Sequence, residues 1–377
     1  MFSSFELRTM RALIRMARRK KGVLGKNPMV AAAVIKDQTC IAYGVHQKEG
    51  GDHAEVIALK KAGEKAESAT LMVTLEPCTH HGKTPPCTDA IIRSGISHVI
   101  YAVEDPSSKI TLNPARQVLE AHGIAVSSGL CSEEARQLNE VFFKTSLCQK
   151  PFVRLKAGLS LDGKIALSNK KSKYITNKEA QKAVHTMRRE CDGVVIGVET
   201  VLQDDPMLTT RFNLLKDGYR NPVKIVLDSQ VRTPVDARIF SSNEQGETIL
   251  FHDRNFRHVR RGYPPNTRQL YVSSREEGGL DWSEILSHLF SLSILDLIIE
   301  GGQRVFSSAL SQNCVDKVYF FYAPKLIAES SAPSPFSCSR LRDLTDAKTL
   351  HSLSFKPFGN NFLVSGYLDS CIFKSEK

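Results

Sequence analysis

Four residues near the N-terminus have the types and spacing that metal-assisted hydrolysis needs. Residues 53–55 read His-Ala-Glu, and Cys78 and Cys87 follow in a segment that reads Thr-Leu-Glu-Pro-Cys-Thr-His-His-Gly-Lys-Thr-Pro-Pro-Cys. One imidazole and two thiolates form a typical zinc ligand set, and three protein ligands leave the fourth tetrahedral position open for a water whose pKa falls to about 7. Glu55, two residues after His53, could exchange protons with that water without ligating the metal.

The same residues match a known chemical signature. H-x-E followed by P-C and a second cysteine is typical of zinc-dependent base deaminases, although here the two cysteines stand further apart than in the usual P-C-x-x-C. The alternative is a closed structural zinc site with His80 or His81 as fourth ligand. That alternative leaves His-Ala-Glu unexplained, so the sequence favours the open, catalytic site.

The elements that must position these residues alternate between helix and strand. Apolar residues at helical spacing predict an amphipathic opening helix over 5–17, and two apolar stretches joined by Asp37 and Gln38 predict a hairpin. The other elements expected here are strands 70–75, 98–103 and 124–127, and helices from His53, over 88–94 and 115–121, and from Ser132. This order indicates a sheet covered by helices.

A second α/β series follows the first. The chain has 377 residues, which is longer than one compact core usually grows. We place a boundary near Lys150, giving domains over 1–149 and 150–377. The second series has expected strands 152–157, 194–196, 223–227 and 295–299, helices 178–189 and after Gly302, and surface loops 254–268 and 329–340.

Composition limits the classes of protein. The apolar fraction of 41% and charged fraction of 24% are those of a globular protein. The sequence has no apolar run long enough for a membrane span, and arginines interrupt the N-terminal segment, so no signal peptide and a cytoplasmic location are expected. Seven of the nine cysteines stand singly and are expected to be free thiols. The net charge of +11 suits a phosphorylated small molecule or nucleic acid and does not distinguish them.

At the His-Ala-Glu and Thr-Leu-Glu-Pro-Cys motifs the chain resembles the bifunctional deaminase/reductase family of riboflavin biosynthesis, whose deaminase half shows H-A-E and T-L-E-P-C-x-H-x-G-x-T-P-P-C. The resemblance extends over nearly the whole chain. Its later motifs are Leu155 to Lys164, Tyr174-Ile175-Thr176, the run Gly197 to Pro206, Val226-Leu227-Asp228-Ser229 and Ile299-Glu300-Gly301-Gly302.

This resemblance implies a fold and a pair of reactions. The N-terminal domain would be a cytidine-deaminase-like three-layer α/β/α domain, and the second a dihydrofolate-reductase-like α/β domain, in agreement with the absence of G-x-G-x-x-G. A diaminopyrimidinone carrying a ribosylamino 5′-phosphate would be deaminated to the aminouracil, and NADPH would then reduce its ribosyl group. Zn²⁺ and NADPH are the implied cofactors.

The resemblance also implies site residues. Metal ligands would be His53, Cys78 and Cys87, and Glu55 would be catalytic. Substrate contacts would be Ser172, Arg188, Leu208, Arg211 and Glu300. Cofactor contacts would be Gly158, Tyr174, Thr200, Asp204, Ser229, Gly302, Gln303, Arg304, Val305, Phe306, Ser307 and Ser308. Arg188 and Arg211 suit a phosphate because guanidinium groups bind it at two points, and Lys83 is a further candidate for phosphate contact.

Three segments depart from the family pattern. Asn27-Pro28-Met29-Val30-Ala31 stands where the family has Asn-Pro-Asn-Val-Gly, Ser107 to Pro114 replaces an Asn-Pro and glycine-rich turn, and Asp52 replaces a proline. These changes leave the zinc residues intact and affect the expected pyrimidine and ribose-phosphate contacts of the deaminase.

Two other functions remain open at this point. One is a tRNA or polynucleotide base deaminase whose basic C-terminal half binds RNA, because base deaminases share the zinc signature. The second half shows no RNA-module motif, so the favoured reading includes no nucleic-acid partner. The other is a zinc-stabilised binding protein without catalysis, which NADPH turnover would distinguish. The chain could form a homo-oligomer, and its sequence does not define that state.

Overall fold

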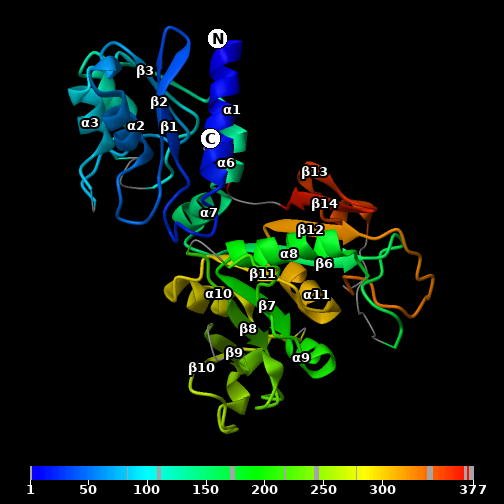
Figure 1. Ribbon diagram of the computed structural model, residues 1–377. Helices are drawn as coiled ribbons and strands as arrows, with labels where there is room; N and C mark the ends of the chain where they lie inside the picture. Colours follow the sequence, from blue (N-terminus) through cyan, green and yellow to red (C-terminus); the bar gives the residue numbers. More distant parts are fainter. Residues whose placement is uncertain are drawn as a thin grey trace. The chain divides into compact units, whose positions relative to one another are not determined.

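The computed structural model describes residues 2–82, 84–107, 112–169, 175–215, 218–241, 246–276, 278–337, 343–368 and 372. The chain divides into two compact units, Met1–Gln149 with Cys371–Lys377, and Lys150–Ser370. Colours from blue to cyan and from green to red follow these two parts of the chain in Figure 1. Among the described residues, no helix combines the length and apolar character required to cross a bilayer.

The first unit contains a five-stranded sheet in the order β2-β1-β3-β4-β5. Strand β1 pairs antiparallel with β2 and β3, and β3, β4 and β5 are parallel to one another. The strands are β1 (Ala31–Lys36), β2 (Thr39–Val45), β3 (Thr70–Val73), β4 (His98–Tyr101) and β5 (Ala125–Ser128).

Helices cover both faces of this sheet. Figure 1 shows α2 (Ala54–Ala62) and α3 (Cys87–Arg93) on one side of the strands and α1 (Ser4–Arg18) with α6 (Ser132–Leu138) on the other. Helix α1 begins with a capping box between Ser3 and Glu6 and buries its apolar stripe. The described part of this unit also contains α5 (Ala115–Glu120), α7 (Glu140–Cys148) and a short 3₁₀ turn, Gly63–Ala66. This is the expected three-layer α/β/α order.

The second unit contains a nine-stranded sheet in the order β10-β9-β8-β7-β11-β6-β12-β14-β13. The strands from β10 to β12 are parallel, and β14 pairs antiparallel with both β12 and β13. The strands are β6 (Phe152–Leu159), β7 (Gly193–Gly197), β8 (Val223–Leu227), β9 (Thr248–Asp253), β10 (Thr267–Val272), β11 (Asp296–Ile299), β12 (Lys317–Tyr322), β13 (His351–Phe358) and β14 (Asn361–Tyr367).

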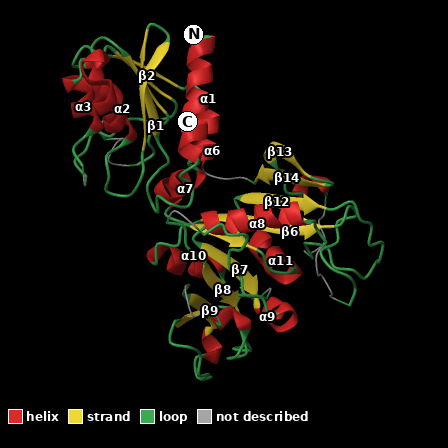
Figure 2. Cartoon of the chain, viewed as in Figure 1, coloured by secondary structure: helices red, strands yellow, loops and turns green. Residues whose placement is uncertain are grey.

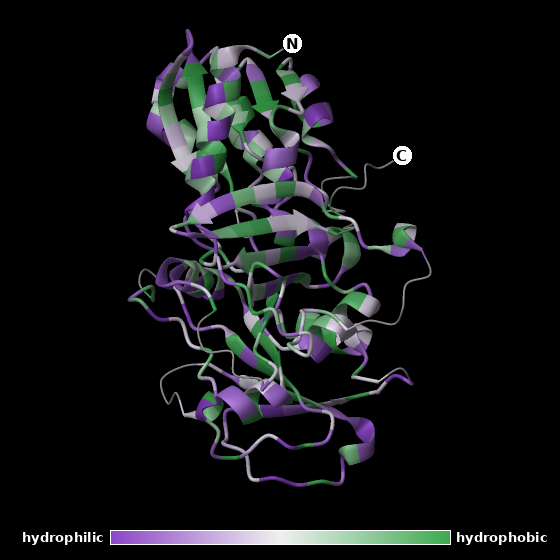
Figure 3. Ribbon diagram, turned by 90° about the vertical axis from the view of Figure 1, so that its right-hand side faces the viewer, coloured by the Kyte–Doolittle hydropathy of each residue, from purple (hydrophilic) through white to green (hydrophobic). Residues whose placement is uncertain are grey.

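Among the described residues, four helices pack on this sheet: α8 (Lys178–Glu190), α9 (Val198–Asp204), α10 (Trp282–Ser291) and α11 (Gln303–Ser311). Figure 2 shows them around the central strands, and Figure 3 shows that those strands are largely hydrophobic. Short 3₁₀ turns cover Arg238–Phe240, Arg254–Phe256 and Leu344–Asp346. The chain runs outward from β7 to β10 and then inserts β11 between β7 and β6, so the winding changes direction beside β11. Ligands of open parallel sheets bind at the carboxyl ends of strands next to such a point.

The sequence predicted most elements of the first unit and fewer of the second. Strands 39–45 and 223–227 have the predicted bounds, whereas α9, α10, β9, β10 and β12 to β14 were not predicted. The expected loop 254–268 is wrong at its end, because β10 begins at Thr267. The helix expected from Ser132 is two helices that meet at Asn139. Cys148 was expected to be a free thiol and is instead disulfide-bonded.

Candidate active sites

His53, Cys78 and Cys87 lie together in the first unit. His53 is the N-cap of α2, Cys78 follows β3, and Cys87 is the first residue of α3. The Nδ1 atom of His53 is 3.2 Å from Sγ of Cys87 and 3.5 Å from Sγ of Cys78, and all three ligand atoms lie within 4.8 Å of one another. Ligand atoms of a tetrahedral zinc site lie roughly 3.5–3.8 Å apart. The group therefore fits a zinc ion.

The two thiols share a strongly polar environment. A hydrogen bond with Cys87, together with one from His53, lowers the pKa of Cys78 to about 4 despite burial. The same hydrogen bond, with Cys78 as its acceptor, raises the pKa of Cys87. These hydrogen bonds favour the thiolate form of Cys78, and a metal cation would favour the thiolate form of Cys87 as well.

Glu55 lies in the first turn of α2 and is only 3% exposed. Burial raises the pKa of its carboxyl group to about 7, and the charge of Cys78 acts in the same direction. A group that titrates near neutral pH can both accept and donate a proton during a reaction. Neither His80 nor His81 belongs to the metal-binding group among the described residues, so the arrangement is the open one. Lys83 lies outside those residues.

Two buried side chains, Asn139 and His46, contact the altered segment Asn27–Ala31. Asn139 accepts a hydrogen bond from the Met29 N–H at 2.7 Å and donates one to the Met29 carbonyl at 3.1 Å. Nδ2 of Asn27 is 3.2 Å from Nε2 of His46, whose ring lies edge-on to the His53 ring. Sequence reasoning did not select Asn139 or His46, because neither belongs to the metal motif.

The acidic residue of Thr-Leu-Glu-Pro-Cys has a separate structural role. Glu76 is 5% exposed and accepts hydrogen bonds from the backbone N–H groups of Asp105, at 3.1 Å, and Ala115, at 2.8 Å. These two residues flank the second altered segment, of which residues 108–111 lie outside the described part. Glu76 therefore anchors both ends of this segment. In the sequence, only its position in the Thr-Leu-Glu-Pro-Cys motif could have indicated that it has a role.

In the second unit, a buried ion cluster forms at the carboxyl end of β11. Glu300 is bound at two points by Arg188 of α8, and Nζ of Lys156 on β6 lies 2.9 Å from its Oε2. Although burial alone would raise the pKa of Glu300, the charges of Arg188 and Lys156 hold it well below its ordinary value. The structure thus brings together Arg188 and Glu300, both expected at the substrate. Lys156 was missed, and its signal was a cation on the otherwise apolar strand β6, which also carries Arg154.

Leu208 and Arg211, also expected at the substrate, lie in the turn after α9. Leu208 is 4% exposed and packs in the core, so only its backbone is available to a ligand. Arg211 is exposed and lines a cavity of about 480 Å³ formed by residues 210–215. Ser172 lies outside the described residues.

Two glycines allow the ends of β7 and β11 to approach each other. A Cβ atom at Gly197 would lie 2.7 Å from Cγ2 of Val305, and one at Gly301 would lie 3.2 Å from the backbone nitrogen of Gly197. Helix α9 starts directly after Gly197, and α11 starts at Gln303 with Gly302 as its N-cap. Their first N–H groups lack partners within the helix, and such groups bind phosphate well.

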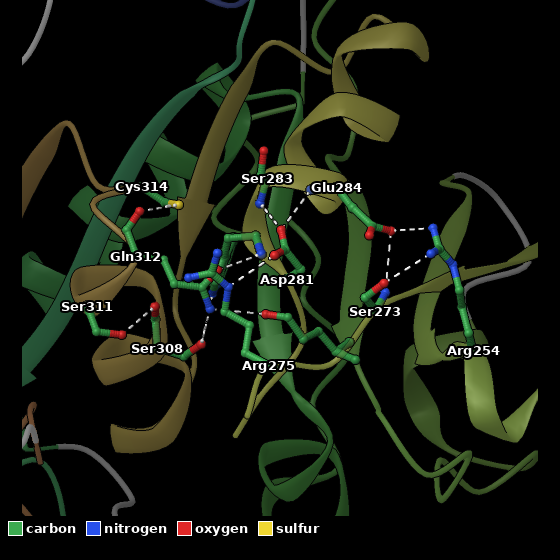
Figure 4. Close-up of polar contacts among 12 residues, drawn as sticks. Arg254, Ser273, Arg275, Asp281, Ser283, Glu284, Ser308, Ser311, Gln312 and Cys314 are labelled. Atoms are coloured by element: carbon green, nitrogen blue, oxygen red, sulfur yellow. Dashed lines mark hydrogen bonds and ion pairs between the residues drawn. The ribbon is translucent and has the colours of Figure 1, made fainter. Parts of the chain in front are cut away.

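The stretch Gly302–Ser308 contributes backbone more than side chains. Val305 and Phe306 are buried in the core, and Ser307 accepts a hydrogen bond from the Ser337 N–H. The Ser308 hydroxyl accepts from Nε1 of Trp282 and from Nε2 of Gln312, the C-cap of α11, and Figure 4 shows its contact with Gln312. Gln303 donates to the Ser334 carbonyl, whereas Arg304 is exposed. The first turn of α11 and Arg304 are therefore the parts open to a ligand.

The other expected cofactor residues are spread over three strand ends. Gly158 lies on β6, where an added Cβ would lie 3.4 Å from Thr176. Thr200 and Asp204 lie on α9, and Ser229 follows β8, with its carbonyl bound by the Asp253 N–H. Tyr174 lies outside the described residues.

Two protein families match separate parts of the chain. The family described as "Cytidine and deoxycytidylate deaminase zinc-binding region" matches residues 3–103, and the family described as "RibD C-terminal domain" matches residues 151–364. The first match contains His53, Glu55, Cys78 and Cys87, and the second contains the Glu300 cluster.

Whole-chain relatives carry one recurring description. Riboflavin biosynthesis protein RibD of Aquifex aeolicus is 41% identical over 85% of this chain and 87% of its own length, and that of Escherichia coli is 35% identical over 89% and 91%. A Thermotoga maritima structure described as a diaminohydroxyphosphoribosylaminopyrimidine deaminase/5-amino-6-(5-phosphoribosylamino)uracil reductase aligns with a TM-score of 0.82, 35% identity and coverage of 97% of this chain and 99% of that one. RibD of Acinetobacter baumannii aligns with a TM-score of 0.82 at 29% identity, with the same coverage.

Proposed function

The chain belongs to the RibD family of riboflavin biosynthesis proteins, and on that premise we propose which residues carry out its two reactions. It is a zinc-dependent deaminase and an NADPH-dependent reductase, and its substrate is a ribosylaminopyrimidine. We assign to it the hydrolytic deamination of 2,5-diamino-6-(5-phosphoribosylamino)pyrimidin-4-one to the aminouracil, followed by reduction of the ribosyl to the ribityl side chain.

The deaminase reaction is assigned to the domain over 1–149. The observation that carries this assignment is the group of three ligand atoms within 4.8 Å, next to the buried carboxyl group of Glu55. His53, Cys78 and Cys87 would hold a zinc ion, which would supply Lewis-acid activation of water. Glu55 takes a proton from the attacking water and delivers one to the leaving amine, which departs as ammonia.

The reductase reaction is assigned to the domain over 150–377. NADPH would supply the hydride for C1′ of the ring-opened ribosylamine, an imine that keeps its bond to the pyrimidine-bound nitrogen, and a proton on that nitrogen would complete the ribityl side chain. The first turn of α11 is suited to a cofactor phosphate. Arg188 is already bound to Glu300 and to the Thr209 carbonyl, so we assign the substrate phosphate to the exposed guanidinium of Arg211.

Purified protein given the diaminopyrimidinone ribosylamino phosphate tests both assignments. Without NADPH, mass spectrometry should detect the aminouracil, and with NADPH the nicotinamide absorbance should fall while the ribityl product forms. A protein that binds zinc and substrate without any turnover would be a binding protein instead. Deamination of a tRNA or of single-stranded polynucleotide in preference to the small substrate would favour the nucleic-acid alternative, which the family match over residues 151–364 disfavours.

We also propose the cytoplasm as the location, because zinc binding needs Cys78 and Cys87 as thiolates; the disulfide at Cys148 is the one observation that does not favour a reducing compartment. Homo-oligomer formation stays a prediction, and light scattering of the purified chain measures it directly.

A further inference from the structure

Three side chains hold three successive residues of the turn that carries Arg211. Arg188 donates to the Thr209 carbonyl at 3.3 Å, Asn221 accepts from the Thr210 N–H at 2.8 Å, and Nδ1 of His185 accepts from the Arg211 N–H at 3.1 Å. His185 and Arg188 are both on α8, one turn apart. The turn is therefore attached to the helix that also binds Glu300.

The backbone of this turn is strained, which explains why it needs such attachment. Leu208, Phe212 and Asn213 have φ angles of +50°, +65° and +53°, in the left-handed region that residues with a side chain rarely adopt. Each such residue is energetically unfavourable and persists only where its surroundings enforce it. Loss of one attachment should let the turn relax away from this conformation.

His185 is the attachment nearest to the ligand-facing side chain. Its ring packs edge-on against Phe212, with ring centroids 5.1 Å apart, and its Nδ1 binds the backbone of the residue that lines the 480 Å³ cavity. Burial and the positive charge of Arg188 lower the pKa of His185 to about 4. The ring is thus neutral near pH 7, as an acceptor of the Arg211 N–H must be. The Arg211 guanidinium has no carboxylate partner within the described part of the chain.

We propose that His185 is a positioning residue of the reductase: it fixes the Arg211 backbone so that the Arg211 guanidinium binds the phosphate group of the substrate. This inference rests on the proposed reductase function and adds to it the residue that controls selection of a phosphorylated substrate. His185 acts only through Arg211, so its removal should weaken binding of the phosphorylated substrate and leave the same molecule without its phosphate unaffected.

The test compares two substitutions in the full chain. His185→Leu removes the acceptor, whereas His185→Asn keeps an oxygen close to the position of Nδ1. With aminouracil ribosylamino phosphate and NADPH, KM for the substrate should rise roughly tenfold in His185→Leu and return to near wild type in His185→Asn, with kcat little changed. His288→Leu is a matched control, because His288 is another helical histidine in ring contact, with Phe251 on β9.

Two further measurements separate positioning from loss of structure. KM for the dephosphorylated substrate should be equal in wild type and His185→Leu. In an Arg211→Ala background, His185→Leu should raise KM little further, because the guanidinium that His185 positions is already absent.

Three outcomes would overturn the proposal: an equal rise of KM for both substrates, additive effects of the two substitutions on KM, or a KM in His185→Asn that stays as high as in His185→Leu. If His185→Leu does not fold, the same comparison is made between His185→Gln and His185→Asn. The longer glutamine side chain keeps an acceptor oxygen but places it away from the position of Nδ1. Absence of reduction by the wild-type protein would instead refute the proposed function.

Discussion

Arg188 and Glu300 are joined by two parallel hydrogen bonds, from Nε to Oε1 at 2.7 Å and from Nη2 to Oε2 at 3.0 Å. Lys156 adds a third contact at 2.9 Å, and the Glu300 side chain is 5% exposed. Two cations thus face one carboxylate with little water between them. The cluster carries a net positive charge at the carboxyl end of β11, which suits an anionic ligand.

Glu300→Gln should both destabilise the second unit and stop reduction. The substitution leaves Arg188 and Lys156 as buried cations without their carboxylate, and breaking a buried pair in this way costs about 3–5 kcal/mol. Urea unfolding should show this loss, and mass spectrometry should show the aminouracil accumulating, because the deaminase residues are untouched.

Glu284→Gln is the matched control for that prediction. Glu284 also pairs with an arginine, Arg254 (Figure 4). Both side chains are far more exposed than those of the Glu300 cluster, at 31% for Glu284 and 54% for Arg254. Exposed pairs contribute about 0–1 kcal/mol. Equal destabilisation by the two substitutions would contradict the argument from burial.

Glu55→Gln should keep zinc and abolish deamination. The amide has nearly the shape of the carboxyl group but cannot take up the proton, and loss of a general acid–base group typically slows a reaction about 10²–10⁴-fold. Metal analysis should give one zinc per chain in both proteins. A deamination rate near that of the wild type would exclude Glu55 as the proton carrier.

Cys87→Ala should separate the two activities. It removes a zinc ligand in the first unit, while the proposed cofactor positions lie in the second. Deamination should vanish and reduction of pre-deaminated substrate should continue, whereas Asp204→Ala should give the reverse pattern. If Cys87→Ala also stopped reduction in protein with an unchanged circular dichroism spectrum, the two sites would have to be coupled.

The stability of the reductase unit should depend on pH through His185. Its pKa is lowered from 6.5 to about 4 in the folded chain, first by burial and then by the charge of Arg188, while Arg211 acts in the same direction and Glu300 opposes both. Between pH 4 and pH 6.5 the His185 side chain binds more protons in the unfolded chain than in the folded one. The contribution of His185 to the free energy of unfolding is therefore complete above about pH 6.5 and is lost as the pH falls towards 4. Melting temperatures from pH 7 to 4 should fall less steeply for His185→Asn. Parallel curves for the two proteins would show that His185 does not titrate as described.

The metal site could be predicted from the sequence because its chemistry is local. His53, Cys78 and Cys87 belong to short motifs whose residue types allow few other functions, and the structure brings their ligand atoms together. The supporting residues could not be predicted in the same way. Asn139 lies 110 positions from Met29, and nothing in either segment indicates that they pair.

The second unit was harder to predict for a related reason. Its strands β9, β10 and β12 to β14 contain both polar and apolar residues. They form strands because they pair with segments that are distant in sequence, and a local pattern does not show this pairing. Lys156 alternates with buried apolar residues on β6, where a charge is unexpected until Glu300 is placed beside it. For the same reason, the side chains of Val305 and Phe306 could not be assigned to the core from their position in a motif.

The close approach of Gly197 and Gly301 limits which substitutions can be used to change the cofactor preference of this enzyme. A methyl group at Gly197 collides with a single side-chain atom, Cγ2 of Val305, so Gly197→Ala should be accommodated once Val305→Ala is made with it. A methyl group at Gly301 meets the backbone at Gly197 and Ile196, which no substitution can trim away. A library that varies these positions should therefore randomise Gly197 jointly with Val305 and leave Gly301 fixed.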